Sequence, residues 1–375
     1  MHSLNRRAWV EIDLGALLRN ASKIAASARV PLLPMVKADA YGLGSVRVAR
    51  TLEVLEPWGY GVSTIAEGEE LRRSTITRPV LVFTPLLEGD FDAAIRADLT
   101  PTLGDVDAIK RWQETRRPWH LDVDTGMNRA GVQWNAVAGL REVIANGPPE
   151  GVFTHFHSAE FKNGTREIQE KRFDDAVAAL PIRPPYIHAE NSPAVQHRAP
   201  SRWTFVRPGA FLYGVTSGDD PGIEPEPVVS VRARIVDLRT IADGETVSYG
   251  GTYRATGDRR IATLSIGYAD GYRRVFGNRA SAIVGGVCVP VVGVVTMDMT
   301  MLDVTGVDCR IGDVATLIGS DGEASIDVME LAVVAEMSPY EVLTGLRGRL
   351  ARRYIDAVHE GAPTEGAQRR SGGNK

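Results

Sequence analysis

Short apolar runs alternate with segments of helical periodicity from residue 9 to about residue 215. The runs are rich in branched residues and have the length of buried strands. The helix-like stretches between them, such as 16–26, 46–55 and 173–180, have apolar residues three and four positions apart. The eight runs are 32–37, 59–63, 80–84, 99–102, 120–124, 151–155, 186–189 and 203–207.

Strands that alternate with helices belong to the α/β class, because a helix between two strands makes those strands parallel. Eight such units predict an N-terminal (β/α)8 TIM-type barrel, with a doubly wound open sheet as the alternative. Polar residues favour the barrel, since many of them follow the C-terminal ends of strands, where a barrel has its catalytic face. The polar residues at these strand ends are Lys37, Arg129, His155, Asn191, Ser192 and Arg207. An open sheet, by contrast, binds ligands only near its switch point.

The pattern changes after about residue 230, where strand-like segments follow one another with Gly and Asp turns between them. They predict a C-terminal mainly β domain. We place the barrel at 9–230 and the β domain at 231–360, which residues 1–8 could join. Residues 361–375 lack large apolar side chains and are expected to be disordered. The β segments are 229–236, 246–249, 260–266, 282–287, 289–295 and 314–318, followed by one helix at 328–335.

Charge and cysteine content exclude several classes of protein. The 43 Lys and Arg nearly balance the 47 Asp and Glu, which gives no electrostatic reason to expect nucleic acid or a membrane as partner. The two cysteines form no Cys-x-x-Cys pair, so buried free thiols are expected rather than a zinc ribbon. No signal peptide or membrane-spanning run is seen, which predicts a cytoplasmic protein.

Lys37 ends an apolar run, and a tyrosine-bearing loop follows it directly. Burial of an ammonium group lowers its pKa, and a neutral amine can attack a carbonyl to form a Schiff base. A strand-end lysine taken alone is more often exposed to solvent. Whether Lys37 is a reactive lysine or an exposed one therefore depends on the rest of the chain.

From about Trp9 to Tyr354 the chain closely resembles the alanine racemase family, whose cofactor is pyridoxal 5′-phosphate (PLP). The resemblance implies an N-terminal barrel and a C-terminal β domain. It rests on these segments in family order: Val36-Lys37-Ala38-Asp39-Ala40-Tyr41-Gly42, Asp124-Thr125-Gly126-Met127-Asn128-Arg129, Thr154-His155-Phe156, His188-Ala189-Glu190-Asn191-Ser192, Val206-Arg207-Pro208-Gly209, Val247-Ser248-Tyr249-Gly250, Ile266-Gly267-Tyr268-Ala269-Asp270-Gly271-Tyr272, Thr296-Met297-Asp298 and Arg352-Arg353-Tyr354.

The resemblance implies a two-base reaction. Lys37 would hold PLP and move a proton on one face of the substrate α-carbon, and Tyr268 would do so on the other. Arg207 would donate to the pyridine nitrogen without protonating it, which weakens the ring as an electron sink and favours racemisation over transamination. His155 and His188 would support Arg207 and Tyr268, although a purely structural role is an almost equal alternative for His188.

The same resemblance implies the remaining contacts. Arg129 would bind the substrate carboxylate, with Met297 also facing the substrate and Asp298 beside it. In the family, the residues that match Tyr268 and Met297 reach the site from the partner subunit, which implies a homodimer with shared active sites. The PLP-binding set is Lys37, Tyr41, His155, Asn191, Ser192, Arg207, Gly209, Ala210 and Tyr354.

Several positions depart from the family pattern, among them Asp122, Asn128 and Val294. Asp122 stands where many members have a carbamylated lysine that orients the arginine, and we expect its carboxylate to supply the same negative charge. Asn128 replaces a glycine, and asparagine tolerates left-handed backbone. Val294 replaces a frequent arginine. These changes leave the Lys37–Tyr268 pair intact.

The resemblance implies interconversion of L- and D-alanine, which supplies D-alanine for peptidoglycan. A serine or broad-specificity racemase on the same fold remains an alternative. A PLP-dependent decarboxylase is disfavoured by Arg207, since such enzymes place an acid on the pyridine nitrogen. A non-catalytic PLP-binding barrel is disfavoured by the β domain.

Overall fold

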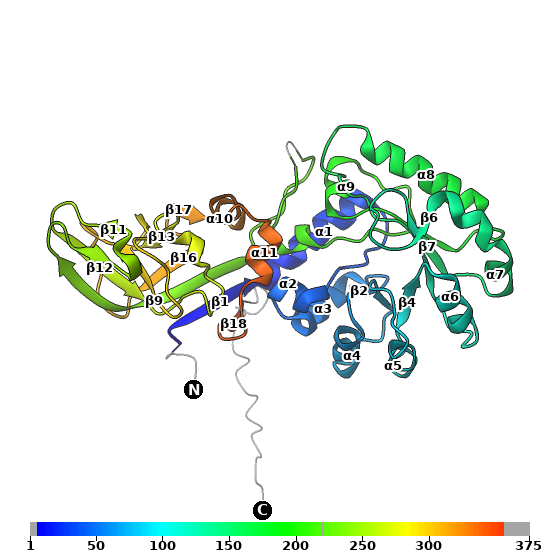
Figure 1. The fold of residues 1–375 in the computed structure, drawn as a ribbon, viewed down its shortest axis with the longest axis horizontal. Helices are drawn as coiled ribbons and strands as arrows, with labels where there is room; N and C mark the ends of the chain where they lie inside the picture. Colours follow the sequence, from blue (N-terminus) through cyan, green and yellow to red (C-terminus); the bar gives the residue numbers. More distant parts are fainter. Residues whose placement is uncertain (1–5, 219–220, 356–375) are drawn as a thin grey trace, which may run out of the picture.

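The computed structural model describes residues 6–218 and 221–355. Figure 1 shows an elongated molecule, with a helix-covered lobe formed by the first part of the chain at one end and a strand-rich lobe at the other. The expected disordered segment 361–375 lies outside the described residues. Within the described ranges, no helix is long and apolar enough to cross a membrane.

The first lobe is a closed barrel of parallel strands. Six strands pair side by side, each parallel to the next. Two further segments close the ring through parallel bridges, Met35 to Gly61, Leu32 to Val206 and Asn191 to Arg207. This confirms the predicted barrel and excludes the open sheet. In order, the strands are β2 (Tyr60–Val62), β3 (Val80–Val82), β4 (Thr100–Leu103), β5 (His120–Asp124), β7 (Gly151–Phe153) and β8 (Tyr186–His188), while β6 (Val132–Gln133) pairs only with β5.

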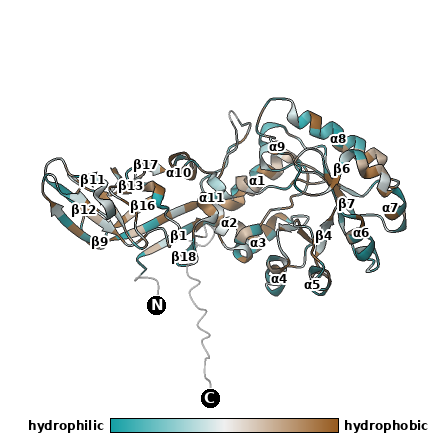
Figure 2. Cartoon of the chain, in the orientation of Figure 1, coloured by the Kyte–Doolittle hydropathy of each residue, from teal (hydrophilic) through white to brown (hydrophobic). Residues whose placement is uncertain are grey.

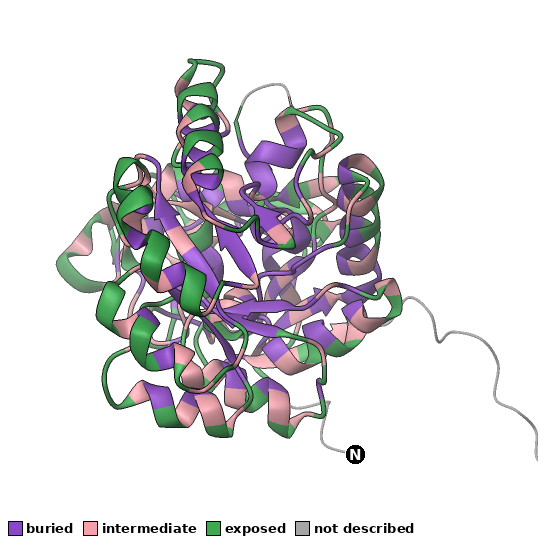
Figure 3. Ribbon diagram, turned by 90° about the vertical axis from the view of Figure 1, so that its right-hand side faces the viewer, coloured by how far each residue is buried: buried purple, intermediate pink, exposed green. Residues whose placement is uncertain are grey.

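Helices surround the barrel strands. Figure 3 shows buried strands inside and helices with exposed outer faces around them, and Figure 2 shows that hydrophilic residues prevail on outer helices such as α6 and α8. The sequence located only the second half of α8, because its first half buries polar residues, Arg166, Gln169 and Glu170, instead of an apolar stripe. The helices are α1 (Leu14–Ala28), α3 (Ser45–Leu52), α4 (Ile65–Arg73), α5 (Asp90–Arg96), α6 (Val106–Gln113), α7 (Arg141–Asn146), α8 (Thr165–Ala179) and α9 (Ser192–His197).

The second lobe contains a nine-stranded sheet whose centre is the long strand β9 (Val229–Ile241). The order β14-β13-β16-β9-β1-β18 is antiparallel except for the parallel β1–β18 pair. The other strands of this path are β1 (Ala8–Asp13), β13 (Ser281–Val284), β14 (Val287–Pro290), β16 (Val314–Asp321) and β18 (Ala351–Ile355); β12 (Arg259–Leu264), β15 (Thr300–Asp303) and β17 (Ala324–Ile326) pair off it.

Smaller elements complete this lobe. β10 (Thr246–Val247) and β11 (Tyr253–Arg254) form a separate ribbon, and α10 (Val328–Ala335) and α11 (Pro339–Thr344) follow β17. The helix predicted at 328–335 is therefore confirmed. Of the two free thiols, Cys309 is buried as expected, whereas Cys288 is exposed.

The strand β1 spans the predicted domain boundary at residue 9. Val10 pairs with Val231 of β9 on one side and with Arg352 of β18 on the other. From β1 in the sheet, the chain enters the barrel region through α1, whose first turn is capped by the Asp13 carboxylate accepting from the Ala16 amide at 2.8 Å. Both ends of the described chain meet in one sheet.

Candidate active site

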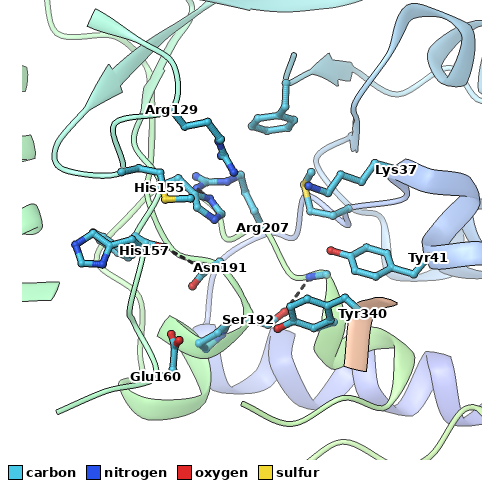
Figure 4. Close-up of a pocket in the computed structure, with 17 residues that line it drawn as sticks. Lys37, Tyr41, Arg129, His155, His157, Glu160, Asn191, Ser192, Arg207 and Tyr340 are labelled. Atoms are coloured by element: carbon cyan, nitrogen blue, oxygen red, sulfur yellow. Dashed lines mark hydrogen bonds between the residues drawn. The ribbon is translucent and has the colours of Figure 1, made fainter. Parts of the chain in front are cut away.

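A cavity of about 280 Å³ opens at the C-terminal ends of the barrel strands. Its size is at the lower end of small-molecule sites, which are roughly 300–1,000 Å³. In Figure 4 the polar side chains converge from several strand ends, with the Lys37 side chain extending toward Arg207 and Arg129. The predicted residues that line the cavity are Lys37, Tyr41, Arg129, His155, Asn191, Ser192, Arg207, Gly209 and Ala210.

Lys37 begins a turn with left-handed backbone, α2 (Lys37–Gly42). Four consecutive residues have φ between 51° and 57°: Ala38, Asp39, Ala40 and Tyr41. Left-handed geometry costs about 1–2 kcal/mol for each L-residue, so this turn is strained and depends on its surroundings. The Ala40 amide bonds the Val36 carbonyl at 2.8 Å, and the Glu67 carboxylate of α4 accepts from the Ala38 amide at 2.8 Å. The turn places Lys37 and Tyr41 on the lining of one cavity.

The environment of Lys37 favours its neutral amine. Burial lowers the pKa of Lys37, and the positive charges of Arg129 and Arg207 lower it further, while Glu67 opposes them. A neutral amine is the nucleophile that attacks a carbonyl. The predicted chemistry of this lysine thus has a physical basis in the site.

Arg207 is buried beneath the cavity, and its Nη1 and Nη2 groups are held by the barrel. Nη2 donates to the carbonyls of Thr154 at 2.7 Å and Ala189 at 3.0 Å. Nη1 donates to Nδ1 of His188 at 2.8 Å, and Nη2 also lies 3.4 Å from Nδ1 of His155. Among the described residues, none accepts a hydrogen bond from the Arg207 Nε–H, which leaves that donor for a ligand.

His120, which the sequence did not single out, extends the hydrogen bonds of Arg207 and His188 by one more ring. Since Arg207 can only donate, Nδ1 of His188 accepts and its Nε2 carries the proton. That Nε2 lies 2.9 Å from Nδ1 of His120, which must accept in turn. Burial and the charge of Arg207 lower the pKa of His120 to about 3 and hold the pKa of His188 well below its usual value. Both rings are therefore neutral.

The other end of the cavity is a cradle for a small anion. The Ser192 hydroxyl accepts from the Gly209 amide at 2.9 Å, and its own proton remains available. Tyr41 points its hydroxyl into the cavity (Figure 4), and burial raises its pKa, so the group stays a neutral donor. A Cβ at Gly209 would lie 2.5 Å from the Tyr41 hydroxyl, so only glycine leaves this space open. Close backbone approach of this kind suits a phosphate.

Arg129 and Asp122 border a second, smaller cavity of about 40 Å³. Within the described part of the chain, the Asp122 carboxylate makes no ion pair with Arg129 within 4.0 Å, and the two charges interact across the gap. Burial raises the pKa of Asp122 to about 6, against the opposing charges of Arg207 and Arg129. Asn128, just before Arg129, has φ 52°, the left-handed geometry expected for it.

Six predicted site residues do not line this cavity. Asp122 and His188 lie beside it, as described above, and the other four belong to the β domain. Tyr268 and Met297 lie on the β domain with 39% and 53% of their surface exposed, and the nearby Asp298 pairs with Arg349 at 2.8 Å. The hydroxyl of Tyr354 donates to the Leu43 carbonyl at 3.0 Å, behind the lysine turn. The tyrosine that lines the cavity from the β domain is Tyr340 of α11.

The sequence also missed several side chains at the cavity wall. Tyr340 packs edge-on against Tyr41, with ring centroids 6.1 Å apart. It lies in a short helix with no strand-end signal, and only the fold brings it to the site. The other unpredicted lining residues with functional side chains are Phe83, Met127, His157 and Glu160.

Comparison with known proteins decides the family. The model of the alanine racemase N-terminal domain matches residues 12–217, and that of the alanine racemase C-terminal domain matches residues 228–354.

The chain belongs to the alanine racemase family.

A relative named alanine racemase from Geobacter sp. strain M21 is 37% identical, with 93% of this chain and 98% of that protein covered. Two solved alanine racemase structures have the same fold. That from Bacillus anthracis, with bound L-Ala-P, has a TM-score of 0.88 at 28% identity and covers 94% of this chain and 96% of its own. That from Bartonella henselae, with covalently bound pyridoxal phosphate, has a TM-score of 0.86 at 26% identity and covers 93% of this chain and all of its own.

Proposed function

We propose that this chain is a PLP-dependent alanine racemase that interconverts L- and D-alanine. The observation that carries the proposal is the pairing, in one cavity, of a lysine whose pKa is lowered with a buried arginine that has a donor to spare. Family membership and the named relatives support the same reaction.

The residues present fit PLP. The cradle around Gly209 that a Cβ would fill suits the phosphate, with donors from Tyr41 and Ser192. Arg207 would donate to the ring nitrogen, and Lys37 would hold the aldehyde carbon. When bound, PLP supplies a carbonyl for covalent attachment and a conjugated ring that stabilises negative charge at the substrate α-carbon.

Racemisation needs a proton-transfer group on each face of the α-carbon. Lys37 would serve one face. Tyr268 would serve the other from the partner subunit of a head-to-tail homodimer, because it is exposed on the β domain and lies outside the cavity of its own chain. With Nδ1 of His155 accepting from Arg207, the proton of that ring sits on Nε2 and is free to orient the incoming tyrosine.

The substrate would be held by its carboxylate. Arg129 reaches the cavity lining, and a guanidinium matches a carboxylate in a bidentate geometry. The exposed Met297 would cover the substrate from the partner subunit. The nearby negative charge of Asp122 would keep Arg129 oriented across the small cavity that they share.

In the cell, the D-alanine made by this reaction would serve peptidoglycan synthesis in the cytoplasm. The balanced charge of the chain agrees with a small-molecule enzyme rather than one that binds nucleic acid.

The test is purified protein reconstituted with PLP and given L-alanine alone, with D-alanine followed by chiral chromatography. D-alanine should accumulate until the two forms are nearly equal, and the Lys37→Ala protein, the matched control, should make none. Turnover of L-serine without D-alanine, or release of CO₂, would contradict the proposal.

A further inference from the structure

In the Arg352-Arg353-Tyr354 segment, Tyr354 was expected to bind the phosphate, and the structure places the Arg352 and Tyr354 side chains against the end of the Lys37 turn. Arg352 of β18 donates to the Gly42 carbonyl twice, from Nε at 3.1 Å and from Nη2 at 2.8 Å. Tyr354, two residues later on the same face of the strand, donates to the Leu43 carbonyl at 3.0 Å. Two side chains of the β domain thus donate hydrogen bonds to the two carbonyls at the end of the Lys37 turn.

The Arg352 guanidinium is itself held in place. Nη1 donates to the carbonyls of Arg347 and Leu350 at 2.7 and 2.8 Å, and Nη2 also donates to Leu346 at 2.8 Å. A planar guanidinium fixed on three carbonyls is a rigid donor for the fourth, at Gly42. The geometry of the Gly42 carbonyl is therefore set by the β domain.

The turn needs such support. Its four left-handed residues store about 4–8 kcal/mol of backbone strain. On the barrel side the support includes the Glu67 bond to Ala38 and the Ser45 amide donating to the Asp39 carboxylate at 2.7 Å. The downstream end, at Gly42 and Leu43, is met by the two β18 side chains instead.

Two glycines make room for this contact. Gly44 has φ +98°, and a Cβ there would lie 2.0 Å from the Tyr354 hydroxyl. Gly42 has φ +86°, and a Cβ there would lie 2.9 Å from the Leu343 carbonyl of α11. The Tyr41-Gly42-Leu43-Gly44 stretch is thus shaped to receive β18 and α11 as closely as backbone allows.

We propose that Arg352 and Tyr354 are positioning residues that hold the strained turn carrying Lys37 and Tyr41, so that the β domain controls cofactor binding in the barrel of the same chain. This inference rests on the proposed function, because it assigns Lys37 and Tyr41 to PLP. It adds a second role within one chain to a domain that already lines the cavity with Tyr340 and that would contribute Tyr268 across a subunit interface.

The structural part of the proposal is tested without cofactor, by hydrogen exchange of the Ala40 and Gly44 amides, which bond to Val36 and Asp39 inside the turn. Arg352→Met keeps the stem and removes the donors, and Tyr354→Phe removes one hydroxyl only. Each should speed exchange at these two amides by about tenfold, the scale of one lost hydrogen bond, while amides of β3 keep their wild-type rates.

The functional part is tested by titrating the apo proteins with PLP. Each variant should bind PLP about tenfold more weakly than wild type, and the loss should appear in kcat at saturating PLP as well, since Lys37 is less well placed. The matched control is Arg353→Met on the neighbouring position of the same strand, where the arginine points to the other face and pairs with Glu11 at 3.4 Å. It should match wild type in both measurements.

The outcomes separate the two proposals. If wild type fails to bind PLP, the proposed function is wrong. If wild type binds PLP but Arg352→Met and Tyr354→Phe match it in affinity and in exchange, the positioning role is wrong. If all three variants are weakened alike, the effect is general destabilisation and the positioning role is again overturned.

Discussion

Nε2 of His188 lies 2.9 Å from Nδ1 of His120 inside the barrel. His120 is the first residue of β5, so a hydrogen-bonded line runs from Arg207 beneath the cavity toward the opposite end of the barrel. The line ends at Nε2 of His120, which has no hydrogen-bond partner among the described residues and lies 4.0 Å from the Glu150 carboxylate. Because the His120 and His188 rings are neutral, Arg207 carries the only positive charge in this hydrogen-bonded line.

The His120 ring predicts a pH dependence of stability. Its pKa is about 3 in the folded chain and about 6.5 when unfolded. Below about pH 6.5 the unfolded state takes up a proton that the folded state refuses, so this contribution is present at neutral pH and is lost as pH falls. It amounts to about 1.4 kcal/mol per pH unit. His120→Asn keeps an acceptor for His188 but cannot titrate.

The measurement is the free energy of unfolding in urea at several pH values between 7 and 4.5, for both proteins. The variant should show a shallower decline than wild type over this window. Because the other titrating groups are common to both proteins, the difference in slope reports on His120 and on the His188 ring bonded to it. Equal slopes would mean that the ring is charged in the folded chain.

The left-handed turn predicts opposite effects of two substitutions at one exposed residue. Ala38 has φ 53°. Ala38→Gly should stabilise the protein by about 0.5–1 kcal/mol, because glycine adopts this geometry without strain. Ala38→Val should destabilise it by about 1–2 kcal/mol, since a branched side chain tolerates positive φ poorly. Urea unfolding measures both, and destabilisation by glycine would contradict the strain argument.

Asp122 predicts a change in substrate affinity. With its carboxylate removed in Asp122→Ala, Arg129 should lose orientation, and KM for alanine should rise about tenfold, the effect of roughly 1.4 kcal/mol, while kcat changes little. In wild type, KM should also rise as pH falls through about 6, where this carboxylate gains its proton. The variant should lack that rise. An unchanged KM in Asp122→Ala would contradict the proposal that Asp122 orients Arg129.

A shared active site predicts complementation between two inactive proteins. Lys37→Ala and Tyr268→Phe should each be inactive as homodimers. After they are mixed and allowed to exchange subunits, half of the dimers are mixed, and each of these has one site with both native residues. Activity should reach about a quarter of the wild-type level. If Lys37 and Tyr268 worked within one chain, no activity would return.

The barrel could be predicted from the sequence because the evidence for each of its strands lies within a few neighbouring residues. Six of the eight runs, such as 80–84, contain a short buried strand, and the other two join the barrel through isolated bridges. Each run could be recognised from its own residues. The place of β1 could not be found this way, since Val10 pairs with residues more than two hundred positions away, in β9 and β18. The pattern of residues 8–13 does not indicate that β9 and β18 are its pairing partners.

The cavity lining was predictable where a polar residue lies at or just beyond the C-terminal end of a barrel segment, as at Lys37, His155 and Arg207. His120 was missed because it starts a strand rather than ending one, and its meaning depends on His188 reaching it across the barrel. Tyr354 was expected at the phosphate, but which neighbours a β18 side chain meets depends on the fold and not on its position in the sequence. The structure turns it toward Leu43, and Tyr340 lines the cavity.

The parallel pairing of β1 with β18 sets an order of events during protein synthesis. The barrel segments and the Lys37 turn leave the ribosome before β18, which fills the edge position beside β1 and carries Arg352. Domains generally fold in the order in which they emerge. A nascent chain would therefore contain its lysine turn before β18 is made, and under the proposed positioning role its readiness to accept the cofactor would wait for that strand.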